Sequence, residues 1–216
     1  MLFRSDIRDI EEFSKVLENA DFELSPQQAF VRNFMSSQTP YNSLLLFHGL
    51  GSGKTCAAIG VCEEMRSYLK QMGINKKIII VASPNVQDNF RLQLFDERQL
   101  TNVNGIWTIK GCIGNKLLKE INSTGMTGLT KETVIQQVNR LISTSYSFNG
   151  YTQFSNEFVR IADQTDNLEL KTRRLQQAYS NTLIVIDEVH NIRISDDNVN
   201  KNVAKNLMTL VQLVTN

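Results

Sequence analysis

One stretch decides the fold: Leu44-Leu-Leu-Phe-His-Gly-Leu-Gly-Ser-Gly-Lys-Thr55. Its four leading apolar residues predict a short buried strand, because the run is too short and too abruptly ended for a helix. Glycines at every second position then predict a tight loop whose backbone N–H groups can approach an anion closely. Residues 56–69 predict a helix. The stretch therefore predicts a strand, a phosphate-binding loop and a helix in succession.

This loop predicts a site for a nucleoside triphosphate. Lys54 would reach the β- and γ-phosphates, and the Thr55 hydroxyl would bind Mg²⁺. The pattern Gly-x-x-x-x-Gly-Lys-Ser/Thr departs at its first position, where His48 replaces glycine. The alternative is a glycine-rich turn with a surface lysine, but strand, glycines, Lys-Thr and helix together favour ATP. The expected nucleotide contacts here are Gly49, Leu50, Gly51, Ser52, Gly53, Lys54 and Thr55.

A second pair of signals lies in Asn181-Thr-Leu-Ile-Val-Ile-Asp-Glu-Val-His190. Residues 183–186 predict a buried strand with two carboxylates at its carboxyl end. Two adjacent carboxylates are costly to bury without a cation, and Mg²⁺–ATP would supply one. Asp187 would hold the metal, and Glu188 would orient and deprotonate the attacking water. His190 would hydrogen-bond on the γ-phosphate side. The alternative is an acidic turn after a core strand.

Further elements predict an α/β fold with a parallel sheet covered by helices on both faces. The stretch at 76–84, Lys-Lys-Ile-Ile-Ile-Val-Ala-Ser-Pro, predicts another buried strand, whose apolar run is uninterrupted as in buried parallel strands. Ligands gather at the carboxyl ends of such strands. Ser83, Pro84 and Asn85 would therefore lie on the same rim as the phosphate loop. Other predicted helices span 85–95, 117–121, 131–142, 154–162, 168–179 and 200–214, with a possible strand at 105–109.

A helix before the loop is predicted over residues 24–35. Ser25 can cap it and Pro26 suits its first position. Gln28 falls in the first turn, where its amide could both donate to and accept from an adenine edge. The predicted buried face contains Phe30, Val31, Phe34 and Met35.

The totals describe an ordinary globular chain. The 216 residues carry a net charge of +1, and 41% of them are hydrophobic. This balance gives no global attraction to nucleic acid or membrane. Three cysteines without Cys-x-x-Cys spacing predict neither a disulfide framework nor a zinc site, and favour a reducing compartment. We find no signal core or membrane span in the sequence, so we expect a soluble, intracellular protein that binds no membrane.

The motifs resemble those of superfamily 2 helicases. Gly49–Thr55 and Asp187–His190 look like motifs I and II, and Leu24–Gln28 is similar to the glutamine motif, with Gln28 in the matching place. Val81–Asn85 resembles motif Ia, whose family role implies nucleic-acid contact by Ser83, Pro84 and Asn85. The resemblance implies a RecA-like P-loop NTPase, the first helicase domain, using ATP and Mg²⁺. From the residues themselves, the apolar spacing at 1–23 predicts a helical flank, and residues 24–216 predict one domain, irregular and mostly helical at about 111–180.

A narrower resemblance points to helicases of nucleocytoplasmic large DNA viruses. It is carried by His48–Thr55, Gly111–Ile121 and Gly150–Phe154. This lineage is similar to the small subunit of the poxvirus early transcription factor and to poxvirus nucleoside triphosphatase I. The resemblance implies nucleic acid as partner, DNA in preference to RNA, and possible association with viral RNA polymerase or a transcription factor. A viral protein of this kind would reside in host cytoplasm, viral factories or the virion.

The family's later Ser/Thr-Ala/Gly-Thr element and second RecA-like domain are not found in these 216 residues. That second domain carries arginine fingers, worth about 10³–10⁵ in rate. We therefore expect this chain alone to bind ATP and hydrolyse it weakly or not at all. Two alternatives to a helicase or translocase remain. One is a nucleotide-gated, non-catalytic module of a viral transcription or packaging complex, and the other is the motor subunit of a restriction-type endonuclease.

Overall fold

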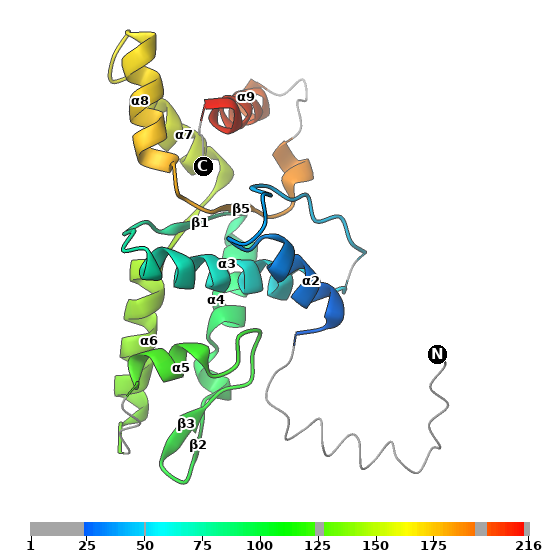
Figure 1. The fold of residues 1–216 in the computed structure, drawn as a ribbon, viewed down its shortest axis with the longest axis vertical. Coiled ribbons are helices and arrows are strands. Elements are labelled where there is room, and N and C mark those ends of the chain that lie inside the picture. Colours follow the sequence, from blue (N-terminus) through cyan, green and yellow to red (C-terminus); the bar gives the residue numbers. More distant parts are fainter. Residues whose placement is uncertain (1–23, 50, 124–127, 193–197, 214–216) are drawn as a thin grey trace.

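A three-stranded parallel sheet forms the centre of the molecule (Figure 1). The computed structural model describes residues 24–49, 51–123, 128–192 and 198–213. The strands stand in the order β4 (Tyr146–Asn149), β1 (Ile78–Val81) and β5 (Ile184–Ile186). Val81 lies level with Asn149 on one side and Ile186 on the other, so the three strands end together. The predicted α/β class is confirmed, and the carboxyl ends of the strands form one rim.

The central strand β1 alternates its side chains between two apolar cores. Ile78 and Ile80 belong to the core made with α3 (Lys54–Gln71), α4 (Pro84–Leu94), α5 (Lys116–Ile121) and α6 (Lys131–Ser145). Ile79 and Val81 face the core made with α7 (Tyr151–Ala162), α8 (Leu168–Tyr179) and α9 (Asn198–Leu213). Figure 1 shows these two groups of helices on opposite sides of the sheet. The apolar run at 78–81 is thus explained by burial on both faces.

Helix α2 (Pro26–Phe34) begins as predicted. The Ser25 hydroxyl accepts from the Gln28 backbone N–H, and the Gln28 side chain accepts from the Ser25 backbone N–H, which makes a capping box. The predicted buried face is only partly correct. Val31 is buried, whereas Phe30 is 67% exposed. Val31 packs on α3, and Phe30, one residue earlier, projects from a different side of α2. Helical spacing alone therefore placed Phe30 on the wrong side.

The strand predicted at residues 44–47 is wrong. The segment forms no strand, and β5 pairs with β1 alone among the described residues. Leu46 packs against a small core of α2 and α3 residues, as Leu183 does. Leu45 and Phe47 are 73% and 92% exposed. An apolar run shows that a segment can be buried, but a strand also needs a neighbour that satisfies its backbone groups. That pairing is not visible in the sequence.

A hairpin and a disulfide follow α4. After a short 3₁₀ turn (Glu97–Gln99), β2 (Thr101–Val103) pairs antiparallel with β3 (Ile106–Thr108). The strand predicted at 105–109 is therefore confirmed, but its partner β2 was not predicted. The expectation of no disulfide is wrong. Cys56, near the start of α3, is bonded to Cys112 in the loop before α5, with 5.2 Å between the Cα atoms. Cysteine spacing could not show that these two segments meet.

The remaining predictions of helices at 85–95, 117–121, 131–142, 154–162, 168–179 and 200–214 agree with α4 to α9 within a few residues. The predicted flank at 1–23 lies outside the described residues. In the part of the chain that is described, no helix is both long and apolar enough to cross a membrane.

Candidate functional site

The phosphate loop leads directly into the longest helix of the described chain. Gly53 caps α3 in the left-handed conformation, with φ +75°, and Gly51 has the same φ. Residues with side chains adopt this conformation only at a cost, so these two glycines are required by the backbone. The Lys54 ammonium donates to the carbonyls of His48 and Gly49, both at 3.0 Å. The Ser52 hydroxyl donates to the same Gly49 carbonyl at 2.9 Å. Leu50 lies outside the described residues.

Gln28 joins α2 to this loop. Its Nε2 donates to the Gly53 carbonyl at 3.3 Å, while its Oε1 accepts from the Ser25 N–H at 3.0 Å. A Cβ placed on Gly53 would fall on the Gln28 amide, well inside van der Waals contact. The amide keeps one further N–H and one further lone pair, which is what recognition of an adenine edge needs. The side chain that sequence analysis assigned to adenine is therefore also a structural link between α2 and the loop.

The acidic pair lies at the rim of the sheet. The Asp187 N–H donates to the Val81 carbonyl at 3.1 Å, which extends the pairing of β5 with β1 by one residue. Glu188 follows with φ +50°, an unusual value for a residue with a long side chain. Its N–H donates to Asp187 Oδ1 at 2.8 Å, and its carboxylate lies 3.2 Å from His190 Nδ1. Strained backbone of this kind gathers at functional sites.

Tyr151, the first residue of α7, also contacts this turn. Its hydroxyl donates to the Asp187 carbonyl at 2.7 Å. Burial raises the pKa of Tyr151, and the nearby carboxylates of Asp187 and Glu188 raise it further, against a hydrogen bond from Asn191 that lowers it. The phenol therefore stays protonated and remains a donor at neutral pH. Sequence analysis did not assign Tyr151 to the site, although it lies in the quoted stretch Gly150–Phe154.

The expected contacts fall into two groups. Gln28 is bonded to the loop that leads into Lys54, and the acidic pair is bonded to the rim. Among the described residues, no hydrogen bond or ion pair joins these two groups. Thr55 follows Lys54 in the first turn of α3 and is half-buried. Ser83 caps α4, whose first residues are Pro84 and Asn85, so these three share the rim with Asp187.

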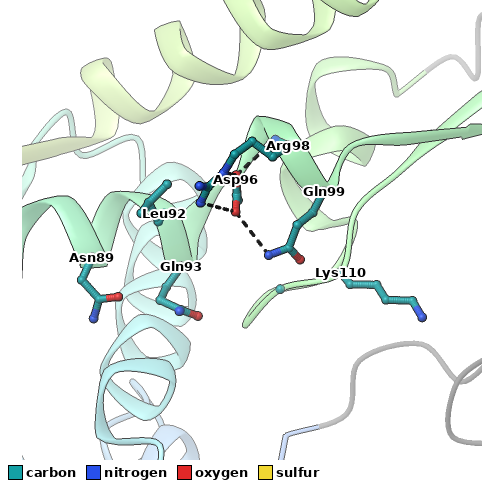
Figure 2. Close-up of a pocket in the computed structure, with 8 residues that line it drawn as sticks. Asn89, Leu92, Gln93, Asp96, Arg98, Gln99 and Lys110 are labelled. Atoms are coloured by element: carbon teal, nitrogen blue, oxygen red, sulfur yellow. Dashed lines mark hydrogen bonds and ion pairs between the residues drawn. The ribbon is translucent and has the colours of Figure 1, made fainter.

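A polar pocket of about 440 Å³ lies elsewhere (Figure 2). Asn89 from the middle of α4, and Leu92 and Gln93 from its carboxyl end, line this pocket away from Ser83. The Arg98 guanidinium binds Asp96 at 2.8 Å and holds the pKa of that carboxyl at about 2, and Gln99 also donates to it. Its lining contains none of the expected ATP, metal or nucleic-acid residues. This pocket is not the nucleotide site.

A buried charge network fixes α3 against its neighbours. Burial alone would raise the pKa of Glu63, but hydrogen bonds from Arg66 and Tyr146, together with the charge of Lys116, leave it lower than usual. The contacts are 2.7 Å from Arg66 Nη2 to Glu63 Oε2 and 2.6 Å from the Tyr146 hydroxyl to Oε1. Arg66 also binds Glu120 of α5 at 2.7 Å. The network holds the helix that begins at Lys54 against β4 and α5.

Comparison with known families now identifies this arrangement. The model of one family, described as "Type III restriction enzyme, res subunit" (ResIII), matches residues 22–214. The chain belongs to this family. It is a helicase-type ATP-binding domain with the P-loop NTPase fold, as the resemblance predicted.

The relatives of this ResIII chain are viral. It is 27% identical over 175 residues to the "Putative ATP-dependent RNA helicase R563" of Acanthamoeba polyphaga mimivirus, covering 79% of this chain and 25% of that protein. It is 22% identical over 228 residues to "Putative helicase 087L" of Invertebrate iridescent virus 3, covering 98% of this chain and 20% of that protein. It is 29% identical over 204 residues to the "Putative ATP-dependent RNA helicase L377" of the same mimivirus, covering 85% of this chain and 16% of that protein.

The resemblance to helicases of large DNA viruses is thus confirmed. The chain spans a quarter or less of the length of these relatives. No solved structure matches it.

Proposed function

We propose that this domain is the ATP-binding part of a nucleic-acid-stimulated ATPase motor, a helicase or translocase acting in viral transcription. One observation carries the proposal. A glycine loop bonded to Gln28 opens an 18-residue helix, and an acidic pair follows the strand next to β1 at the rim of the same sheet. A phosphate-binding loop combined with carboxylates at strand ends is what metal-assisted phosphoryl transfer requires.

The nucleotide would be held by the loop and by Gln28. Lys54 would exchange the carbonyls of His48 and Gly49 for the β- and γ-phosphates, because an ammonium gains more from charged oxygens than from neutral ones. The backbone N–H groups of Gly51, Ser52 and Gly53 would face the phosphates, as would those of Gly49 and Leu50. Gln28 would present its remaining N–H and lone pair to adenine.

The donor set fits Mg²⁺. This ion prefers oxygen ligands, is commonly held by one or two protein groups plus phosphates, and keeps several waters. The Thr55 hydroxyl and the Asp187 carboxylate are oxygen ligands of that kind. No group of three or more His, Cys, Asp or Glu side chains occurs among the described residues, which agrees with a site that needs the nucleotide to complete it. When bound, the ion would neutralise charge on the phosphates.

Glu188 would serve as the general base. Its carboxylate is exposed at the rim, and the 3.2 Å contact with His190 Nδ1 gives it a partner that can orient it. The water that Glu188 orients would attack the γ-phosphorus and the Glu188 carboxylate would take its proton, while the bond from that phosphorus to the oxygen it shares with the β-phosphate breaks and ADP leaves. His190 would hold the carboxylate and respond to the γ-phosphate. These roles belong to the site as it would stand with a second RecA-like domain closed on it.

Nucleic acid would bind at the rim beside Ser83, Pro84 and Asn85, at the start of α4. The viral lineage favours DNA as the activator, whereas the names of two relatives, R563 and L377, favour RNA. Both polymers therefore belong in the test. A viral RNA polymerase or transcription-factor subunit is the expected protein partner, at the sites of viral transcription.

The deciding experiment measures ATP turnover by the full-length protein and by this chain, each without nucleic acid and with single-stranded DNA, duplex DNA or RNA. We expect the full-length protein to be stimulated and this chain to be nearly inert. Lys54→Ala should abolish turnover and weaken ATP binding. Lys70→Ala is the matched control, since Lys70 lies on the same helix and makes only an exposed ion pair with Glu120. Turnover that no nucleic acid changes would refute the motor.

A restriction-type motor is the second candidate, since the matching family bears that description. Cleavage of duplex DNA by the full-length protein would favour it over a helicase. A nucleotide-gated module is the third, and equal turnover by wild type and Glu188→Gln would favour it.

A further inference from the structure

Four hydrogen bonds hold the backbone around the Asp187–Glu188 peptide, two of them on this peptide itself and one on each neighbouring peptide. Asp187 donates to Val81 on the neighbouring strand, and the Glu188 N–H donates to the Asp187 carboxylate. The Asn191 N–H donates to the Glu188 carbonyl at 2.9 Å. The fourth contact is the 2.7 Å hydrogen bond from the Tyr151 hydroxyl to the Asp187 carbonyl. In three of these contacts the donor is a backbone N–H of residues 187–191. The fourth donor, the Tyr151 hydroxyl, comes from α7.

The ring of Tyr151 is itself firmly placed. It packs against two apolar cores, one that contains Phe154 and one made of Ile192, Val203 and Ala204, and the residue opens α7 just after β4. The Phe154 ring, one turn later, is buried in the first of these cores. A rigid ring fixes its hydroxyl, so the hydroxyl in turn fixes the carbonyl that it binds.

That carbonyl matters because of the backbone that follows it. Glu188 sits at φ +50°, where a residue with a Cβ is under steric strain and relaxes when its surroundings allow. Rotation of the Asp187–Glu188 peptide would release the strain and swing the Glu188 carboxylate away from its present place. Such a rotation breaks the hydrogen bond from Tyr151, so this bond opposes it.

We propose that Tyr151 is a positioning residue for ATP hydrolysis, whose hydroxyl locks the Asp187–Glu188 peptide and so aims the Glu188 carboxylate at the attacking water. This inference rests on the proposed function. It assigns a role to the stretch Gly150–Phe154, which the nucleotide site itself does not use. Tyr151 touches neither nucleotide nor metal in this role and acts through Glu188 alone.

The test compares Tyr151→Phe with Tyr179→Phe in the full-length protein. Both changes remove one phenolic oxygen from the same helical core, but the Tyr179 hydroxyl has no partner among the described residues. Tyr151→Phe removes the hydrogen bond to the Asp187 carbonyl and also the one from Asn191. Loss of the first, which positions the base through the peptide, should cost about tenfold in rate. We expect Tyr151→Phe to lower kcat about tenfold with KM for ATP and nucleotide affinity within twofold, and Tyr179→Phe to match wild type.

A double variant isolates the route of the effect. In the Glu188→Gln background the group that Tyr151 positions is no longer a base, so adding Tyr151→Phe should lower the residual turnover less than twofold. A further tenfold loss there, or a rise in KM with kcat unchanged, would show that Tyr151 acts otherwise and overturn the proposal. Equal kcat for Tyr151→Phe and Tyr179→Phe would also overturn it.

Hydrogen exchange supplies a readout that needs no turnover. Tyr151→Phe should raise the exchange rate of the amides at 187–191 several-fold and leave those of α3 unchanged. Unchanged exchange at 187–191 would refute the lock even if activity fell. Absence of ATP turnover in wild type would instead refute the proposed function, while the exchange result would still decide whether Tyr151 holds the turn.

Discussion

Two glycines of the phosphate loop offer an internal comparison. Gly51 and Gly53 share a φ of +75°, so alanine at either position meets the same backbone strain. Their surroundings differ, because a Cβ on Gly51 would meet nothing within 4 Å and a Cβ on Gly53 would fall on the Gln28 amide. To make room, Gln28 would have to give up its 3.3 Å hydrogen bond to the Gly53 carbonyl. Gly53→Ala therefore carries one penalty that Gly51→Ala does not.

The magnitudes follow from these contacts. Left-handed backbone costs an alanine about 1–2 kcal/mol, offset in part by about 0.4–1 kcal/mol from the stiffer unfolded chain. Both terms apply equally to the two variants and cancel in their difference. The lost Gln28 hydrogen bond is worth about 1 kcal/mol. We expect Gly53→Ala to lower the free energy of unfolding by about 1 kcal/mol more than Gly51→Ala does.

Urea unfolding checks this, with both substitutions made in wild type and in a Gln28→Ala background. The loss of the capping contact to Ser25 in that background affects every member of the set and cancels. The difference between the two alanine variants should vanish there. Equal penalties in wild type, or a difference that survives Gln28→Ala, would refute the link between Gln28 and the loop.

Three further predictions concern stability. Cys56 and Cys112 are 56 residues apart, so on the loop-entropy account reduction of their disulfide should lower the free energy of unfolding by about 4 kcal/mol. Thermal unfolding with dithiothreitol should show a lower Tm, and an unchanged Tm would contradict this. Hydrogen bonding from Arg66 lowers the pKa of Glu120 from 4.5 to about 2, so its ionised form adds stability above pH 4.5 that is lost as pH falls toward 2. Glu120→Gln should therefore cost about 1 kcal/mol at pH 7, allowing for solvent screening, and nothing near pH 2 in urea unfolding; a penalty constant with pH would contradict this. Tyr179→Phe removes a buried hydroxyl that has no hydrogen-bond partner among the described residues. The variant should be as stable as wild type or more stable by up to about 1 kcal/mol in thermal unfolding, and a lower Tm would contradict this.

The sequence was most informative where local chemistry sets the structure. Ser25 and Pro26 define the start of α2 because capping and a fixed proline φ act within a few residues. The apolar run at 78–81 identified β1 because burial on both faces leaves no polar position. The run at 44–47 is equally apolar but forms no strand, since pairing depends on a neighbour more than a hundred residues away.

The candidate site shows the same division. Lys54 could be predicted because it follows glycines at fixed offsets, and Asp187 because it ends an apolar strand. Tyr151 could not, since its contact with the Asp187 carbonyl spans 36 residues and depends on β4 and β5 both flanking β1. The disulfide between Cys56 and Cys112 could not be predicted for the same reason. Contacts made through tertiary structure leave no periodic signal in one sequence.

The position of His48, where the usual motif has glycine, now has a physical explanation. Residue 48 serves the loop through its carbonyl, which accepts from Lys54, and a backbone carbonyl is available whatever the side chain. Gly51 and Gly53 are different, because their φ of +75° disfavours any residue with a Cβ. Gly49 has neither a positive φ nor a neighbour within 4 Å of a Cβ. The folded loop by itself therefore does not require glycine at 49, whereas the proposed function would, because a phosphate would approach its backbone closely.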